Sequence, residues 1–264
     1  MNRLFRIRKE IDKRLYTGIA IFSFVLLIGV WQLLSVTGMV NSVFLPAPTE
    51  VVGTIIDSFV SGSIWEDLYI SCYRIFMRFI YAVIVGVILG IIAGCFKVTE
   101  AFIQTLVEFI RYLPVPAFVP LIMVWVGIDE SAKIAVIFIG TLFQLIPMVA
   151  DDIRDVPEDY VNAGYTLGAS RMTVIFKILI PGMMPRLMDT LRMMMGWAWT
   201  YLVVAELVAA SSGLGYSILK AQRYLKTPTI FAGIIIIGLL GLIIDRTFSF
   251  ISKRIFAWAE GGTR

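Results

Sequence analysis

Histidine is absent from this 264-residue sequence, and cysteine occurs only at Cys72 and Cys95. Without histidine, the commonest metal ligand and neutral-pH general base is missing, and Ser-His-Asp or Cys-His catalysis is impossible. Two cysteines exclude a disulfide-rich scaffold and a four-cysteine metal site. The sequence also lacks a Gly-Lys dipeptide, and therefore a Walker A phosphate loop. We therefore expect no enzymatic activity, no metal and no cofactor bound by this chain.

Charged residues are also scarce, at 16% of the chain, whereas 59% are hydrophobic and the mean hydropathy is +0.87. Soluble domains contain about 25% charged and about 45–50% apolar residues. This composition excludes a disordered chain, a coiled coil and an ordinary soluble enzyme. It predicts an all-α integral membrane protein.

Apolar runs predict about six transmembrane helices, because crossing a hydrocarbon core of about 30 Å takes roughly 20 helical residues. In chain order, the predicted spans are residues 18–36, 79–96, 101–127, 134–150, 193–219 and 227–244. The third and fifth differ from the others in composition, because they contain ionisable residues. The basic N-terminus is interpreted as leading into a retained first span. A cleaved signal peptide would have a shorter apolar run and a small-residue cleavage site.

A less apolar segment, residues 41–74, separates the first two spans and opens on Leu45-Pro46-Ala47-Pro48. Thr49 is predicted to cap a helix that continues to Phe59. This amphipathic helix is too short to cross a bilayer. It either lies on the membrane interface or the bundle, or simply connects two spans.

The basic residues predict the topology. With six spans, both termini share one side of the membrane, and that side holds 16 of the 23 Lys and Arg residues. The opposite side holds Arg74, Arg78, Lys133, Lys220, Arg223 and Lys226. The positive-inside rule therefore places both termini in the cytoplasm of a bacterial-type inner membrane. The net charge of +4 reflects this topology, and nucleic acid is not an expected partner.

A long polar loop, residues 151–190, follows the fourth span. Asp155 and Glu158 resemble a capping box at the start of a short helix. Gly168 suits the left-handed conformation that ends a helix, and Ser170 can cap the next one. The loop is therefore predicted to contain two short helices joined by a tight turn.

The second of these helices is predicted over residues 171–180, with Pro181 directly after it and Pro185 reopening the chain towards the fifth span. Small residues keep the turn slim. A slim helical elbow of this kind can enter a groove on another protein.

The same loop resembles the cytoplasmic motif of importer permeases of the ATP-binding cassette class: Glu-Ala-Ala, three residues, Gly, nine residues, Ile-x-Leu-Pro. This sequence has Asn162-Ala163-Gly164, Gly168 and Ile178-Leu179-Ile180-Pro181 at that spacing. It departs from the motif by Asn for Glu, Gly for the second Ala and Ile for Leu. In the family the loop docks on the ATPase. The resemblance implies ATPase-coupling roles for Asn162, Ala163, Gly164, Gly168, Ala169, Ser170 and Pro181.

Residues 111–117, 197–207 and 212–216 are similar to the nitrate/sulfonate/taurine/bicarbonate branch of the same family, and the likeness covers about residues 44–258. It implies a type I importer permease fold, a second permease copy, two ATP-binding subunits that hold ATP and Mg, and an external solute-binding protein. The implied division is a basic N-terminus and first span (1–43), a permease core (44–258) and a C-terminal tail (259–264).

Ionisable residues inside spans are costly and mark candidate functional sites. Arg111 precedes Pro114, and a proline-broken helix at membrane depth is tolerated where it lines a cavity or the protein interior. Arg111 either offers a positive site to an anion or pairs with Glu108 or Glu206. Glu206 could alternatively line the path or cap a local turn, and Trp199 could line a cavity or pack between helices. The candidate translocation-path residues are Arg111, Pro114, Trp199 and Glu206.

Three basic residues, Lys220, Arg223 and Lys226, lie in the predicted outer loop between the fifth and sixth spans. A positive outer mouth would concentrate anions and could contact an acidic face of a binding protein. The alternative is that these are solvated loop charges without a specific role.

Together these features predict the membrane-spanning permease subunit of an ATP-driven importer. It would pass a small anionic or zwitterionic solute, such as nitrate, bicarbonate, a sulfonate or taurine, by alternating access coupled to a separate ATPase. An ion-coupled secondary transporter is the alternative, although it would be expected to show internal repeats or more intramembrane carboxylates. A membrane-embedded enzyme ranks last, since no catalytic arrangement is present.

Overall fold

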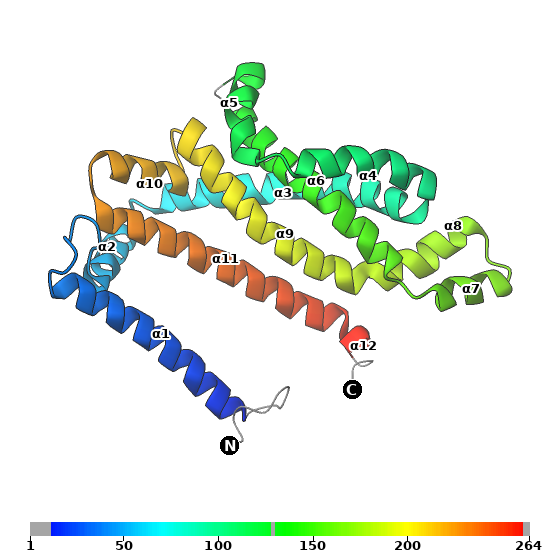
Figure 1. Cartoon of the computed structure of the whole chain (residues 1–264), viewed down its shortest axis with the longest axis horizontal. Coiled ribbons are helices and arrows are strands. Elements are labelled where there is room, and N and C mark those ends of the chain that lie inside the picture. The colour runs from blue at the N-terminus through cyan, green and yellow to red at the C-terminus, as the bar shows by residue number, and fades with distance from the viewer. Residues whose placement is uncertain (1–11, 128–129, 261–264) are drawn as a thin grey trace. The chain divides into compact units, whose positions relative to one another are not determined.

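The computed structural model describes residues 12–127 and 130–260, and these residues form helices and turns without a β-strand. Figure 1 shows the chain coloured from its N-terminus to its C-terminus. The helices are α1 Lys13–Val36, α2 Pro48–Val60, α3 Trp65–Cys95, α4 Lys97–Arg111, α5 Val115–Val126, α6 Glu130–Arg154, α7 Glu158–Thr166, α8 Arg171–Val174, the π-helical turn η2 Ile175–Leu179, α9 Ile180–Ala209, α10 Leu214–Arg223, α11 Thr227–Ile255 and α12 Ala257–Glu260.

Four of the described helices, α1, α3, α6 and α11, are long and apolar enough to cross a membrane. The pair α4 and α5 qualifies as a fifth span only if the two are counted together, because they are bent by 97° relative to each other. The expected span over residues 101–127 is thus two helices, and the prolines at the bend explain the break. The fifth predicted span was misplaced: α9 begins earlier, at Ile180, and ends at Ala209 before the separate helix α10.

The chain forms two compact units, one comprising residues 1–62 and 221–232 and the other residues 63–220 and 233–264. In the first unit, none of the α1 residues is buried, and most of its apolar side chains are exposed, as expected for a helix in lipid. The Trp31 indole donates a hydrogen bond to the Pro46 carbonyl at 3.0 Å, and its ring lies 5.4 Å from that of Phe231. These contacts fix the turn that leads into α2.

The start of α2 differs from the prediction. Ala47 is the N-cap residue, no side chain caps the helix, and Pro48 occupies its first turn. Thr49 is therefore inside the helix. Proline suits this position because its missing N–H would have no helical partner there and its fixed φ is already helical.

The second unit is built on α3, α6 and α9, which pack against one another (Figure 1). The α3–α6 contact is close because α3 presents glycines to α6. A Cβ atom on Gly90 would lie 2.6 Å from the Cβ of Val149 and 2.9 Å from the Ile146 carbonyl oxygen. Small residues at such crossings let helix backbones approach, which is the usual basis of helix association in membranes.

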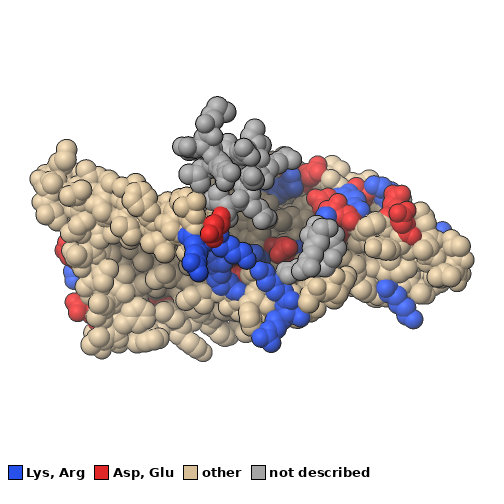
Figure 2. Space-filling view, turned by 90° about the horizontal axis from the view of Figure 1, so that it is seen from below, with Lys and Arg blue, Asp and Glu red and all other residues tan. Residues whose placement is uncertain are grey.

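Figure 2 shows one face of the molecule, on which most described residues are uncharged and the Lys, Arg, Asp and Glu residues gather in patches. The basic N-terminal residues up to Lys9, the sequence before Asp12 and the last four residues lie outside the described part. The signal-peptide question and most of the 259–264 tail therefore rest on sequence alone.

Candidate functional site

The elbow between α6 and α9 has the predicted tight turn. Gly168 has φ +81°, its N–H donates to the Tyr165 carbonyl at 2.9 Å, and the Ala169 N–H donates to the Gly164 carbonyl at 3.0 Å. This is the Schellman arrangement, in which a residue in the left-handed conformation ends the helix. The Ser170 hydroxyl then accepts from the Thr173 N–H at 3.3 Å and caps α8, as predicted.

Two details of the elbow correct the sequence interpretation. Pro157, and not Asp155, is the N-cap residue of α7, and no side chain caps that helix. The Asp155 carboxylate instead forms an ion pair with Arg186 of α9. An ion pair with a residue distant in the sequence has thus taken the place of the predicted capping box.

The second correction concerns the prolines after the elbow. The chain does not leave the helix at Pro181 or reopen at Pro185. It runs from α8 through the π-helical turn η2 into α9, which contains both prolines. A π-helical turn widens the backbone at the point where proline offers no N–H, so the helix can continue past it.

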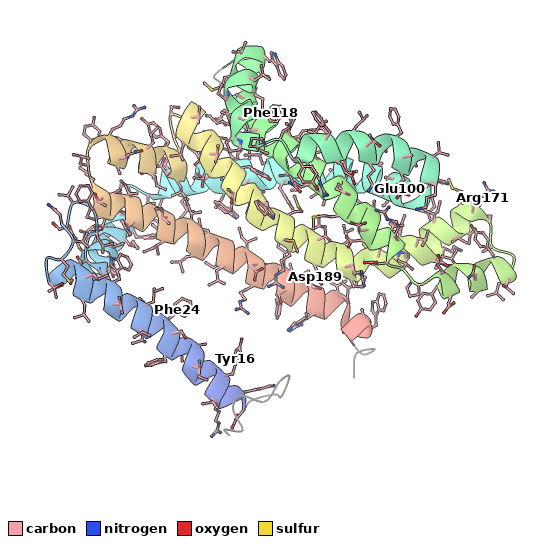
Figure 3. All side chains as sticks on the ribbon, viewed as in Figure 1. Tyr16, Phe24, Glu100, Phe118, Arg171 and Asp189 are labelled. Atoms are coloured by element: carbon pink, nitrogen blue, oxygen red, sulfur yellow. The ribbon has the colours of Figure 1, made fainter. Side chains whose placement is uncertain are left out.

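The surface of the elbow is open to solvent. The side chains of Asn162, Ala163 and Ser170 are exposed, and Leu167 at the tip is 87% exposed. Figure 3 labels Arg171 at the start of α8, at the same end of the second unit as the tip of the elbow. Gly164 is the exception, because it is buried against η2, where an added Cβ would lie 2.5 Å from Cδ1 of Ile178. Gly164, which stands where the family motif has its second Ala, therefore lies on the inner side of the elbow, away from the exposed surface.

A cluster of charged residues joins three helices of the second unit, with four buried members and one exposed carboxylate, and we call it the buried charge cluster. Its members are Arg74 and Arg78 of α3, Glu130 and Lys133 of α6, and Glu206 of α9. The Glu206 side chain is fully buried, Arg74, Arg78 and Lys133 are at most 6% exposed, and the Glu130 side chain is 53% exposed. Ion pairs join these residues across three helices. An ion pair at this depth is stable only when additional hydrogen bonds satisfy both partners.

Arg74 is the best-satisfied member of the cluster. Its Nε donates to Glu130 Oε2 at 2.9 Å, its Nη1 donates to Glu206 Oε1 at 2.9 Å, and its Nη2 pairs with the other Glu130 oxygen. Nη1 also donates to the Ser212 carbonyl at 2.6 Å. One guanidinium therefore links α3, α6, α9 and the turn before α10.

The Glu206 carboxylate holds the turn before α10 in place by hydrogen bonds. It accepts from the Ser71 hydroxyl at 2.8 Å and from the Gly215 N–H at 2.8 Å. The neighbouring amides are held in the same way: Gly213 N–H donates to Asp67 at 2.7 Å, and Leu214 N–H donates to the Ser71 hydroxyl at 2.9 Å.

Helix α10 begins at Leu214, so its first amides are capped by side chains of α3 and α9 rather than by its own sequence. The glycines of the turn are required by this close approach. A Cβ on Gly213 would lie 2.3 Å from Glu206 Oε1, and one on Gly215 would lie 2.8 Å from Glu206 Cβ. Of the roles considered for Glu206, the structure therefore shows the capping of a local turn, with Arg74 as its ionic partner.

The sequence interpretation missed Arg74, Arg78 and Lys133, which it placed in outer loops. In the structure, α3 begins at Trp65, and all three cations are buried. Their positive charge does not end the helix at the membrane surface, because Glu130 and Glu206 compensate it. A signal was available in the sequence. Ser71, Arg74, Ile75 and Arg78 recur at three- and four-residue spacing and so share one helix face.

Arg111 is the last residue of α4 and lies at the bend before Pro114, the N-cap residue of α5. It is partly buried, its Nη2 donates to the Tyr112 hydroxyl at 3.3 Å, and its guanidinium lies 5.1 Å from the Tyr112 ring. The pairing with Glu206, one of the alternatives considered, does not form, because Glu206 bonds to Arg74 instead. Glu108 accepts from Gln104 at 2.7 Å. Arg111 and Glu206 are thus not neighbours in one site.

The other candidate residues have contrasting environments. Trp199 is 5% exposed and packs in the core between helices, while its indole N–H has no hydrogen-bond partner in the described structure. The side chains of Lys220, Arg223 and Lys226 are exposed. Figure 3 labels Glu100 on α4, which forms an ion pair with Arg154 of α6 and fastens the bent pair to the core.

Comparison with known proteins agrees with this architecture. The family described as "Binding-protein-dependent transport system inner membrane component" matches residues 86–257. The chain is 33% identical over 232 residues to a putative aliphatic sulfonates transport permease protein of Escherichia coli, with 88% of each covered. It is 28% identical to the taurine transport system permease protein of the same organism, over 91% of this chain and 89% of the relative. It is also 28% identical to the nitrate import permease protein of Leptolyngbya laminosa, over 94% and 89%.

Among solved structures, an inward-facing MetNI methionine ABC transporter matches with a TM-score of 0.63 at 19% identity, over 73% of this chain and 94% of that chain. At this identity the likeness concerns the fold alone. The all-helical core, the elbow and the family match over 86–257 lead to one assignment: the chain belongs to the family of inner-membrane permease components of binding-protein-dependent ABC transport systems.

Proposed function

We propose that this chain is the permease subunit of an ATP-driven importer for a small anionic or zwitterionic solute of the sulfonate, taurine or nitrate type. The names of its relatives support this solute class: aliphatic sulfonates, taurine and nitrate. Bicarbonate belongs to the same class of small anions. ATP and Mg would bind to a separate ATPase subunit.

The observation that carries the coupling part of the proposal is the elbow. Its narrow tip is held in place by backbone hydrogen bonds. The apolar side chain of Leu167 at the tip is exposed to solvent. Through η2 it continues without a break into α9. Force applied at the elbow by a moving ATPase would therefore reach the core of the bundle through one rigid helix.

We further propose that two permease copies form the path and that alternating access occurs by rocking of the helix bundles. Arg111 and Pro114, at the bend between α4 and α5, remain the candidates for lining this path. Lys220, Arg223 and Lys226 are the candidates for contact with the external binding protein. Their exposed positive charge would attract either an acidic face of that protein or the anion itself.

The coupling is tested with Leu167→Asp in the complex co-expressed with its ATPase and binding protein. Because Leu167 is 87% exposed, the change removes no internal packing. We expect ATPase copurification or solute-stimulated ATP hydrolysis to fall about tenfold or more, since a buried carboxylate would be placed in the docking groove. Val60→Asp is the matched control, because Val60 is equally exposed at 82% and lies outside the elbow.

Two results would contradict the proposal. Wild-type ATPase coupling in Leu167→Asp would remove the docking role of the elbow. Failure of any ATPase to copurify with the wild type, together with solute uptake driven by an ion gradient, would favour a secondary transporter instead.

A further inference from the structure

A polar pocket of about 280 Å³ lies between α9 and the C-terminal part of α11, within the second unit. The side chains that give it its polar and aromatic character are Asp189 and Arg192 of α9, Ser249, Ser252 and Lys253 of α11, and Phe256. Figure 3 labels Asp189, which lies on α9 beside α11. The pocket therefore brings a carboxylate, two cations and two hydroxyls together, and none of them belongs to the buried charge cluster or to the elbow.

Most of these polar groups are not used by the fold. Four have no hydrogen-bond or ion-pair partner within residues 12–127 and 130–260, namely Asp189, Ser249, Ser252 and Lys253. The serines also differ from Thr247 on the same helix, whose hydroxyl donates to the Ile243 carbonyl at 2.8 Å. Arg192 is held by Asp245, with 2.7 Å between Nη2 and Oδ2. Acceptors and donors thus line one cavity without satisfying one another.

The charges around the pocket indicate what it can bind. Arg192 and Asp245 neutralise each other, which leaves one negative charge, on Asp189, and one positive charge, on Lys253. A simple anion would be repelled by the carboxylate, and a simple cation by the lysine. A zwitterion with an ammonium and an oxyanion suits both, because a carboxylate only accepts hydrogen bonds, whereas lysine and serine donate them.

The pocket lies at the level expected for lipid headgroups. Residues 227–244 of α11 are uncharged, and Ser249 follows them by roughly 8 Å along the helix. The headgroup region of one leaflet is about 5–8 Å deep. Helix side chains point back towards the N-terminus, so Lys253 reaches towards the same level. The ring of Phe256 lies 6.4 Å from that of the exposed Trp258, and aromatic residues are enriched at this interface.

We propose that this pocket binds the phosphoethanolamine headgroup of a membrane lipid. The ammonium group donates to Asp189, and the phosphate accepts from Lys253 and from the hydroxyls of Ser249 and Ser252. The acyl chains follow the exposed apolar side of α11, where Ile243 is 61% exposed. Such a lipid would connect α9, the helix that continues from the elbow, with α11. The inference requires only that the chain lies in a membrane and does not depend on the solute that it transports.

The test measures which lipids the purified full-length protein retains. The protein, in a mild detergent, is mixed with equal amounts of dioleoyl phosphatidylethanolamine, phosphatidylcholine and phosphatidylglycerol, and bound lipids are counted by native mass spectrometry. Phosphatidylcholine is the decisive comparison, because its methyl groups remove the N–H donors and keep both charges. We expect phosphatidylethanolamine to be retained about tenfold over phosphatidylcholine, the factor that one charge-assisted hydrogen bond supplies.

Two variants separate the two halves of the headgroup. Asp189→Asn should lower the ratio of phosphatidylethanolamine to phosphatidylcholine about threefold or more, because the acceptor loses its charge. Asp159→Asn removes an exposed carboxylate on α7, outside the pocket, and should keep the wild-type ratio. Lys253→Gln should weaken retention of all three lipids, since all contain a phosphate. Arg254→Gln is its matched control, because Arg254 is the exposed neighbour that does not line the pocket.

Three results would overturn the proposal. The first is equal retention of phosphatidylethanolamine and phosphatidylcholine by the wild type, or an unchanged ratio in Asp189→Asn. The second is an equal loss of lipid in Lys253→Gln and Arg254→Gln, which would show attraction by surface charge alone and which decides the question if Asp189→Asn does not fold. The third concerns taurine, a soluble zwitterion with the same pair of groups. If taurine raises the unfolding temperature of the delipidated wild type but not that of Asp189→Asn, the pocket binds a solute and not a lipid.

Discussion

At the scale of single residues, the buried carboxylate of Glu206 takes the place of a helix cap. An exposed helix start can leave its first amides to water, whereas a start inside a membrane protein cannot. Glu206, Ser71 and Asp67 bind three successive amides, at Gly215, Leu214 and Gly213. The turn before α10 is therefore held by hydrogen bonds from side chains of α3 and α9, and not by its own sequence.

Gly213→Ala tests this arrangement. Gly213 has φ +111°, and an added Cβ would lie 2.3 Å from Glu206 Oε1. We expect the variant to be destabilised by about 1–3 kcal/mol, because the new methyl group strains the backbone and pushes the carboxylate off its amides. The measurement is the unfolding of the purified protein in detergent.

Gly196→Ala is the control for that experiment. Gly196 lies in the middle of α9, and nothing is within 4 Å of an added Cβ. Alanine favours helix over glycine by about 1 kcal/mol, so this variant should be as stable as the wild type or slightly more so. Equal stability of the two variants would contradict the tight-turn argument.

At the scale of elements, the core of the second unit depends on how closely α3 and α6 approach. A row of small residues on α3, namely Gly86, Gly90 and Gly94, faces Leu145, Val149 and Ile153 of α6. Without a hydrophobic driving force between helices in lipid, close packing of this kind is a main source of association. The charged cluster then adds connections at one end of the same crossing.

Gly90→Ala should separate these two helices. A Cβ there would meet the Cβ of Val149 at 2.6 Å and the Ile146 carbonyl oxygen at 2.9 Å, neither of which can move without the backbone. We expect a loss of about 1–3 kcal/mol in stability. Gly238→Ala in α11, with nothing within 4 Å of the new Cβ, provides the comparison. If both variants unfold at the same denaturant concentration, the close crossing does not limit stability.

At the scale of the whole molecule, the topology remains a prediction from charge. The elbow is expected on the cytoplasmic side and the C-terminal end of α10 on the outer side. Leu167 and Lys220 are exposed representatives of these two places. Both belong to the same compact unit.

Cysteine labelling in intact cells measures this topology. The native cysteines, Cys72 and Cys95, are free and half-buried, so they would first be replaced by serine and alanine. A membrane-impermeant maleimide should then label Lys220→Cys in intact cells and label Leu167→Cys only after the membrane is opened. Labelling of both variants in intact cells would refute the predicted orientation.

The approximate positions of four membrane helices, α1, α3, α6 and α11, could be predicted from the sequence, because apolar length alone decides whether a segment can cross lipid. The expected number of six was too high, since the described residues contain four such helices, or five if the bent pair α4 and α5 is counted as one span. The elbow turn was predictable for a similar reason: Gly168 and Ser170 act on backbone groups a few residues away. The capping box at Asp155 failed because a distant residue, Arg186, competes for the same carboxylate.

The sequence by itself determined the class of protein, its helical nature and the motif that assigns it to a transport family, since these depend on composition and on local spacing. Only the tertiary structure decided which charges are buried together. Arg74, Glu130 and Glu206 are far apart along the chain, and each alone would look unfavourable in a membrane. Their mutual neutralisation is a property of three packed helices. In the described part of the chain, the same packing leaves Nε and Nη1 of Arg78 without a hydrogen-bond partner, which no local sequence pattern predicts.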